Sequence, residues 1–387
     1  MDVPFAFGPE GVPGLPANFD LSRLLASAGG PVNWEVASAV AIQMAGDSDS
    51  PPRWSDVEDE YAGLVRAAEV PVSDYTGLAT PKLLEPVQVV SRAHWCELHL
   101  HAFEPMIVPL AEKLAAAQAA NAVPGQEPFA NLFRAMMPFL LGAQAGTMVG
   151  WLSHHVLGRY DLQVPPPVEG GLVFVAPNLE AAERDLNVVP YDFKFWLALH
   201  EVVRAVEYGQ PGVREQFVEL ARNVVDAIRI DPERLASLGS LEGFDMADPT
   251  SMQRLLDDAE GLADAMVEPG HEDALERLEA YFGIIEGYAA HVTQHVGPDR
   301  IPTLAQIEEA ISDRRLTASS DDVFQQMLGF DVRRRHFEPA RLFCDTVVAV
   351  EGMDVLNRVW RSTEDRPTLE EIHEPDLWLA RTVGRRG

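Results

Sequence analysis

A histidine, a glutamate and an arginine on one predicted helix are the residues of this sequence with the clearest chemical meaning. The segment from Phe195 to Arg204 follows the pattern H-E-x-x-H except at its last position. In the intact pattern, two histidines four residues apart bind one Zn²⁺, and the glutamate acts as general base on the metal-bound water. Here His200 and Glu201 are present, but Arg204 replaces the second histidine. A guanidinium has no acceptor and stays protonated, so Arg204 cannot serve as a zinc ligand.

A second candidate ligand, Glu286, lies on a predicted helix from Leu275 to Val296. The carboxylate is at the edge of an apolar stripe, where it is costly unless it meets a metal or a cation. Gly283 and Gly287 flank it and would let another helix approach closely. The stripe consists of Leu278, Phe282, Ile285, Ala289, Val292 and Val296.

His291 and His295 follow on the same predicted helix, four residues apart. Helical rotation turns them about 140° and 180° away from Glu286, so the three cannot share one metal. Two histidines on a polar helix face are usually solvated, and we expect that state for this pair.

Charge arithmetic favours a metal-free site. A +1 and a +2 charge about 5 Å apart repel by roughly 7 kcal/mol at an effective dielectric near 20. We therefore expect Arg204 to replace the metal's charge by bridging Glu201, which is three residues away on the helix, and Glu286. The simpler alternative is that His200 is a core histidine and Glu201–Arg204 an ordinary helix salt bridge.

The elements that must hold these residues are mainly helical. The motif helix is expected to begin at Pro190, a favoured first helical residue, and to end at Tyr208 before Gly209. Trp196, His200 and Arg204 then follow one stripe of that helix. The best strand candidate is Gly171–Pro177, a short apolar run bounded by glycine and proline.

The chain's organisation is predicted as an extended arm and two helical parts. The arm covers residues 1–20, an N-terminal helical subdomain residues 21–165, and a core with both site helices residues 166–387, with one continuous domain as the alternative. Residues 239–251 are polar and acidic and are expected to form a loop.

Composition limits the classes of function. Of 387 residues, 47% are hydrophobic and 23% charged, as in globular proteins, and the net charge of −30 makes nucleic acid a poor partner. Cys96 and Cys344 form no metal or redox motif, and the first residues lack the features of a signal peptide. We expect a cytoplasmic protein.

One segment has the length and apolarity of a membrane span. Ala135–Ser153 contains no charge, and Gly142, Gly146 and Gly150 form a ladder of small residues. Pro138 and several polar residues moderate its hydropathy. We expect a buried helix whose glycine face lets a neighbour pack closely, with a membrane-associated protein as the alternative.

Taken together, these residues resemble the zincin-like metallopeptidases of type 2, a family whose members are described as hydrolases. The resemblance implies a mainly helical zincin-like fold with an active site between the motif helix and the Glu286 helix. By this resemblance His200 matches the first zinc ligand, Glu201 the catalytic base and Glu286 the third ligand. The matching segments span nearly the whole chain: Pro4–Gly8, Gly30–Trp34, Gln144–Gly150, His155–Asp161, Trp196–Glu201, Glu286–Val292, Gly352–Trp360 and Pro367–His373.

The departure at Arg204 leaves two hypotheses open. In the first, the chain is a metal-free, catalytically impaired member that needs no cofactor and binds a peptide, a partner protein or an active relative. In the second, it is an active zinc metallohydrolase that recruits a replacement ligand, such as Glu207 or a loop histidine. In both, Trp196 and Tyr288 are expected to line the site.

Overall fold

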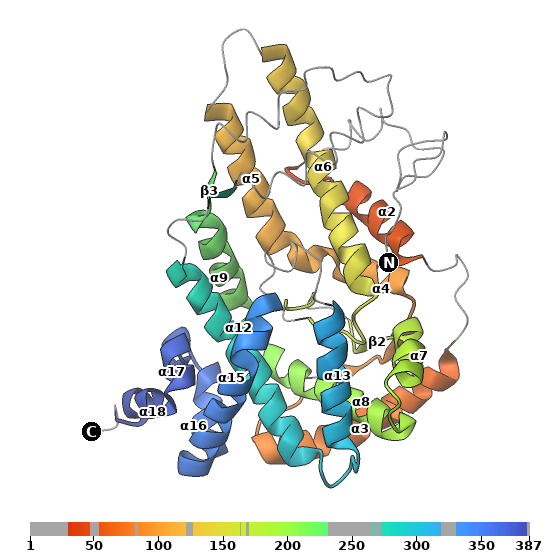
Figure 1. Cartoon of the computed structure of the whole chain (residues 1–387), viewed down its shortest axis with the longest axis vertical. Helices are drawn as coiled ribbons and strands as arrows, with labels where there is room; N and C mark the ends of the chain where they lie inside the picture. The colour runs from red at the N-terminus through yellow and green to blue at the C-terminus, as the bar shows by residue number, and fades with distance from the viewer. Residues whose placement is uncertain are drawn as a thin grey trace. The chain divides into compact units, whose positions relative to one another are not determined.

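The structure is a computed structural model, and it describes residues 30–46, 54–81, 84–120, 127–162, 164–167, 170–230, 266–267, 272–318 and 330–384. These residues are mainly helical, which confirms the predicted fold class (Figure 1). The arm predicted at residues 1–20 and the loop at 239–251 lie outside the described residues.

Long α-helices make up most of the described chain. The helices are α2 (Trp34–Ala45), α3 (Ser55–Thr76), α4 (Arg92–His99), α5 (Glu104–Ala120), α6 (Glu127–Ser153), α7 (Ala176–Asp185), α8 (Pro190–Tyr208), α9 (Val213–Ala227), α12 (Glu272–Val296), α13 (Leu304–Ala318), α15 (Phe330–Glu351), α16 (Met353–Leu356), α17 (Leu369–His373) and α18 (Pro375–Val383). The described residues also include the 3-10 helices η2 (Leu100–Phe103), η4 (Asn357–Trp360) and η5 (Thr363–Asp365).

Strands are few and short among the described residues. β1 (Gln88–Val90) pairs in parallel with β2 (Val173–Val175), with Val89 opposite Phe174. β2 lies inside the run Gly171–Pro177, so the predicted strand is confirmed. β3 (Arg229–Ile230) and β4 (Met266–Val267) form a second, antiparallel pair.

The chain folds into two compact units, each assembled from three segments. One unit takes its described residues from segments 1–49, 92–154 and 222–271, and the other from segments 50–91, 155–221 and 272–387. The site helices α8 and α12 both belong to the second unit. The domain boundary expected near residue 165 is a different division and stays a prediction.

In the first unit, α6 packs its glycine ladder against α2. A side-chain carbon at Gly146 would lie 2.4 Å from the Ala37 carbonyl oxygen, and one at Gly142 would lie 2.3 Å from that of Asn33. Arg134–Ser153 is long and apolar enough to cross a membrane, with a mean hydropathy of 1.2, but 61% of its most apolar window is buried inside the protein. The expected close packing of the glycine face is therefore observed.

In the second unit, α8 forms a buried axis. The helix begins at Pro190 and ends at Tyr208, as predicted, and its residues from Phe195 to Tyr208 are all buried. Gly209 follows with a φ of −78°, so this helix end does not use the left-handed conformation that glycine favours. A side chain there would instead meet the Ala205 carbonyl oxygen at 2.9 Å. Because the stretch from Phe195 to Tyr208 is buried, each polar side chain within it needs a hydrogen-bonding or charged partner.

α12 packs alongside α15 in the same unit (Figure 1). Its predicted apolar stripe is buried from Phe282 to Val296. Gly287 permits the contact with α15, because a side-chain carbon there would lie 2.5 Å from the backbone of Ala340. The glycine beside Glu286 thus has the predicted role of close helix approach.

Gly146→Ala tests whether the glycine ladder is a packing device. The added methyl group collides with α2, so we expect the free energy of unfolding to fall by about 1–3 kcal/mol, although alanine favours helices. Gly63→Ala in α3 is the matched control, since no atom lies within 4 Å of its added carbon. The control should gain about 0.5–1 kcal/mol. Urea unfolding followed by circular dichroism compares the two, and a Gly146→Ala variant as stable as the control contradicts this packing.

Candidate functional site

His200 stacks on Trp196 one helical turn earlier on α8. The two rings lie 5.6 Å apart between centroids and 17° from parallel. Both side chains are buried, with His200 only 7% exposed. Trp196 and His200 therefore share one face of α8, and the role of Trp196 in lining a functional site stays a prediction.

Arg204 lies at the centre of a buried group of charges. Its guanidinium is 0% exposed, and its Nη2 atom forms an ion pair with Oε1 of Glu286 on α12. Its Nη1 atom donates to Oε2 of Glu207 at 3.3 Å, within α8. We call Arg204, Glu207 and Glu286 the buried triad. It joins the two helices of the predicted site through the ion pair between Arg204 and Glu286.

The triad corrects one expected contact. Arg204 does pair with Glu286, but its second carboxylate is that of Glu207, three residues after it, and not that of Glu201, three residues before it. Both glutamates are one helical step from Arg204, so the sequence spacing allows either. The Glu201 carboxylate is held elsewhere, by the backbone.

Burial and charge together determine the protonation of the triad. Burial alone would lower the pKa of Arg204, but the carboxylates of Glu286 and Glu207 outweigh it, and the pKa lies above its ordinary value. Burial raises the pKa of Glu207 to about 8, against the opposing effect of Arg204 and with a further contribution from Glu286. At pH 7 Glu207 is then mostly protonated, and the triad carries one positive and one negative charge, without net charge in the core.

Glu201 holds a turn of the backbone. Its carboxylate accepts hydrogen bonds from the amide of Arg159 at 3.0 Å and from the amide of Tyr160 at 3.1 Å. Gly158 makes this contact possible, since a side-chain carbon there would lie 2.6 Å from the Glu201 carboxyl carbon. Asp161 supports the same turn by accepting from the Leu157 amide at 2.9 Å. Among the described residues, the atoms that contact the predicted catalytic base are thus structural groups.

The environment of Glu201 favours its neutral form. Burial, and to a lesser degree the Asp161 carboxylate, raises the pKa of Glu201 to about 8, although the amides of Tyr160 and Arg159 act in the opposite direction. The side chain is 0% exposed. A general base must reach water, and this carboxyl group is enclosed by protein.

Tyr288 lies two residues after Glu286, and its hydroxyl is directed to another part of the unit. It donates to Oδ1 of Asn357 at 2.8 Å, and its ring meets Trp360 edge to face. Asn357 in turn donates to the Thr76 carbonyl at 2.7 Å. The contacts of the Tyr288 hydroxyl therefore fix the packing of η4 and α3 around α12.

The residues at this site do not fit zinc. A catalytic zinc normally takes three protein ligands and a water. Position 204 supplies a cation in place of a ligand, and the same cation pairs with Oε1 of Glu286, the residue expected to be the third ligand. A divalent ion beside the guanidinium would also meet a repulsion of roughly 7 kcal/mol at about 5 Å.

Two features of the site differ from the sequence-based predictions. From the sequence, Glu207 is predicted only as a replacement zinc ligand, although its position three residues after Arg204 also allows the ion pair that the structure shows. The turn at 157–161 belongs to a segment of the family resemblance, but nothing in its sequence indicates that it wraps the Glu201 carboxylate. That contact joins positions about forty residues apart.

Glu286→Gln and Glu207→Gln test the charge balance of the buried triad. The first removes the charge that compensates Arg204, so we expect a loss of order 3 kcal/mol in the free energy of unfolding at pH 7. The second replaces a mostly neutral group, so we expect a loss of about 1–2 kcal/mol. Urea unfolding at pH 7 measures both. Equal losses would contradict the assignment of the proton to Glu207.

Glu201→Gln tests the raised pKa of Glu201. Between its ordinary value near 4.5 and about 8, the folded protein holds a proton that the unfolded chain has lost. This carboxyl group therefore makes stability fall as pH rises through that window, by up to about 1.4 kcal/mol per pH unit, and the effect levels off above pH 8. Glutamine carries no such proton. The stability of the variant relative to wild type should thus rise from pH 5 to pH 8, and a constant difference would disprove the shift.

Comparisons with known proteins agree with this arrangement of helices. The crystal structure of a "putative hydrolase with a novel fold" from Chloroflexus aurantiacus superposes with a TM-score of 0.65 at 25% sequence identity, over 92% of this chain and 100% of that chain. None of the curated proteins matches. The sequence model of the family described as "zincin-like metallopeptidase" matches residues 32–379. This range includes α8, α12 and the buried triad. The chain belongs to the family of zincin-like metallopeptidases.

Proposed function

We propose that this chain is a non-catalytic member of its family, in which Arg204 replaces the positive charge of zinc and the protein acts by binding. The observation that carries the proposal is the fully buried guanidinium of Arg204, paired with Glu286 across the two site helices. The family identity supports a zincin-like scaffold. Zinc-dependent hydrolysis is disfavoured in this chain because Arg204 has no lone pair to give to the metal.

The cost of hydrolysis without zinc supports the same conclusion. Zinc lowers the pKa of bound water from about 15.7 to about 7. Without that shift, a base such as Glu201 faces a gap of about eight pK units, on the order of 11 kcal/mol. The Glu201 carboxylate is also engaged by the amides of Arg159 and Tyr160, so moving it toward substrate would expose those two amides.

The binding partner that we propose is a peptide or a protein in the cytoplasm, including an active relative of this chain. The net charge of −30 disfavours nucleic acid as the partner.

An active metallohydrolase is the second candidate, and one atom favours it. Oε1 of Glu207 is buried and has no hydrogen-bond partner among the described residues. If Arg204 moved aside, this oxygen could join His200 and Glu286 as a third ligand. The candidate requires the guanidinium to leave two carboxylates in the core, which is unfavourable by several kcal/mol.

Arg204→His distinguishes the two candidates. The variant restores the H-E-x-x-H pattern opposite Glu286. If the chain is a non-catalytic member of its family, we expect this variant to bind about one more zinc ion per chain than the wild type. Metal content is measured on full-length protein after incubation with Zn²⁺ and dialysis. Arg204→Met is the matched control, since it removes the charge but supplies no nitrogen ligand, and it should gain no zinc.

His200→Ala provides the opposite test on the wild-type chain. If wild-type protein holds a zinc ion that this variant loses, a metal occupies the motif site and the non-catalytic proposal is wrong. Loss of zinc caused by changes elsewhere in the chain does not bear on the motif. Peptidase activity that depends on Glu201 and survives Arg204→His unchanged would support the active enzyme instead.

A further inference from the structure

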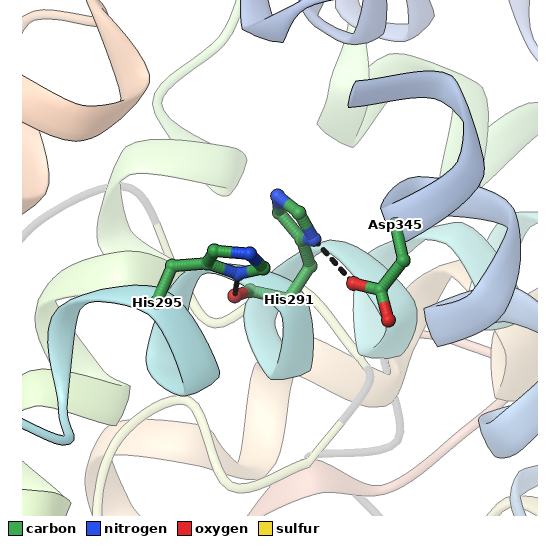
Figure 2. A group of neighbouring side chains, drawn as sticks. All are labelled: His291, His295 and Asp345. Atoms are coloured by element: carbon green, nitrogen blue, oxygen red, sulfur yellow. Dashed lines mark hydrogen bonds and ion pairs between the residues drawn. The ribbon is translucent and has the colours of Figure 1, made fainter. Parts of the chain in front are cut away.

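His291, His295 and Asp345 bring metal-ligating atoms together outside the motif site. The two histidines share one face of α12, and Asp345 lies opposite them on α15 (Figure 2). One ligand atom from each residue lies within 4.8 Å of the other two. The histidine rings are 4.2 Å apart between centroids. This arrangement corrects the expectation of two solvated histidines, since His291 is 0% exposed.

The close crossing of α12 and α15 places Asp345 over the histidines. Gly287 lies four residues before His291, and its missing side chain admits the backbone of Ala340. Asp345 lies on α15, five residues after Ala340, and its Oδ1 atom is 2.6 Å from Nδ1 of His291. The position of the carboxylate is thus fixed by helix packing and not by a flexible loop.

The hydrogen bonds of the two rings determine which nitrogens can bind a metal. Nδ1 of His295 lies 2.8 Å from the His291 carbonyl, which can only accept, so Nε2 of His295 carries the lone pair. Nδ1 of His291 donates to Asp345, and its Nε2 accepts from the Tyr75 hydroxyl at 2.8 Å. Metal-binding histidines typically have such an acceptor on the second ring nitrogen. His295 therefore already has the tautomer of a ligand.

We propose that His291, His295 and Asp345 bind a divalent transition-metal cation such as Zn²⁺, at a site separate from the zincin motif. The cation would bind Nδ1 of His291 and Oδ1 of Asp345 in place of the hydrogen bond between them, and Nε2 of His295 would supply the third bond. Because zinc–ligand bonds are about 2.0–2.2 Å long in tetrahedral geometry, the Asp345 oxygen has to move away from Nδ1 by somewhat less than about 1 Å. His291 then carries its hydrogen on Nε2 and donates to the Tyr75 oxygen, whose hydroxyl rotates. Its proton count is unchanged. Two imidazoles and one carboxylate form a ligand set that suits zinc.

The surrounding charges leave room for a cation. Arg341 donates to Oδ2 of Asp345 at 2.6 Å and is the one basic side chain that contacts the site among the described residues. Glu338 pairs with Arg341 and Glu308 acts on it electrostatically, so three carboxylates face one guanidinium. Burial raises the pKa of Glu308 to about 6, which leaves it mostly ionised at pH 7. The local charge of about −2 differs from the neutral buried triad and matches a divalent ion.

Access to the site is from the side of His295, which is exposed, while Asp345 is 30% exposed. A cation can therefore reach two of its three ligands from water without unfolding α12. The enclosed histidine, His291, holds the inner end of the site. Stacking of His295 on Tyr75, with centroids 5.3 Å apart, orients the outer ring.

Binding of Zn²⁺ to the metal-stripped, full-length chain tests the proposal, with isothermal titration calorimetry for stoichiometry and Co²⁺ absorption for coordination. We expect one ion per wild-type chain. His295→Ala should weaken binding at least tenfold without loss of fold, because its side chain is exposed. Asp345→Asn is a second variant with the same expectation. His94→Ala, an exposed histidine paired with Glu97, is the matched control and should bind as wild type does.

His200→Ala separates this proposal from the proposed function. One ion in wild type and in His200→Ala, but none in His295→Ala, supports the new site and leaves the motif metal-free. One ion that is lost in His200→Ala and kept in His295→Ala overturns both. Two ions in wild type and one in each variant support the new site and overturn only the metal-free motif. No binding by any of the proteins overturns the new site alone.

Discussion

The placement of one guanidinium inside the protein constrains the rest of the second unit. Arg204 has no exposed surface, so its charge must be balanced by groups that the fold itself supplies. α12 supplies the charged Glu286 and α8 supplies Glu207, and the proton held by Glu207 brings the group close to neutrality. α8 and α12 must therefore approach each other at these residues, and the missing side chain at Gly287, next to Glu286, lets α15 approach α12 closely. A shift of either helix by one turn would leave a bare charge in the core.

Three glutamates near one another have different roles because their surroundings differ. Glu286 pairs with a cation, Glu207 carries a proton beside the same cation, and Glu201 accepts hydrogen bonds from two backbone amides. The last arrangement depends on Gly158, whose missing side chain lets the turn close over the carboxylate. The same glutamate that the motif assigns to proton transfer thus fixes the path of the chain. Its two functions compete, since a carboxylate enclosed by backbone amides is not available to a water molecule.

The sequence predicted local features well and pair choices poorly. Both ends of α8, the strand within Gly171–Pro177 and the glycine face of α6 follow from proline, glycine and apolar spacing, which act over a few residues. The partner of Arg204 does not, because Glu201 and Glu207 are equally distant along the helix and only the turn at 157–161 decides between them. The prediction that His291 is exposed to solvent is wrong because it also depends on which other element packs nearby. Helical rotation placed His291 away from Glu286, but it could not show that α15 covers that face as well.

A metal and a guanidinium can join two helices in the same way and still differ in chemistry. Each places positive charge between carboxylates in the core, and each is directional, since a planar guanidinium donates along fixed lines as a metal bonds along its coordination axes. The guanidinium keeps its charge at any ordinary pH and cannot be removed by a chelator. A guanidinium has no empty orbital that could accept the lone pair of a water molecule, however. It can therefore link two helices as a metal does, but it cannot act as a Lewis acid. The surroundings of His291 differ from those of Arg204 in two ways. The ionised carboxylates around Asp345 outnumber the one guanidinium of Arg341, and the two imidazoles have lone pairs that a metal can bind, which a guanidinium lacks. On α12 the fold thus presents one carboxylate that is paired with an arginine and, one to two turns further along, two histidines that face a carboxylate on α15.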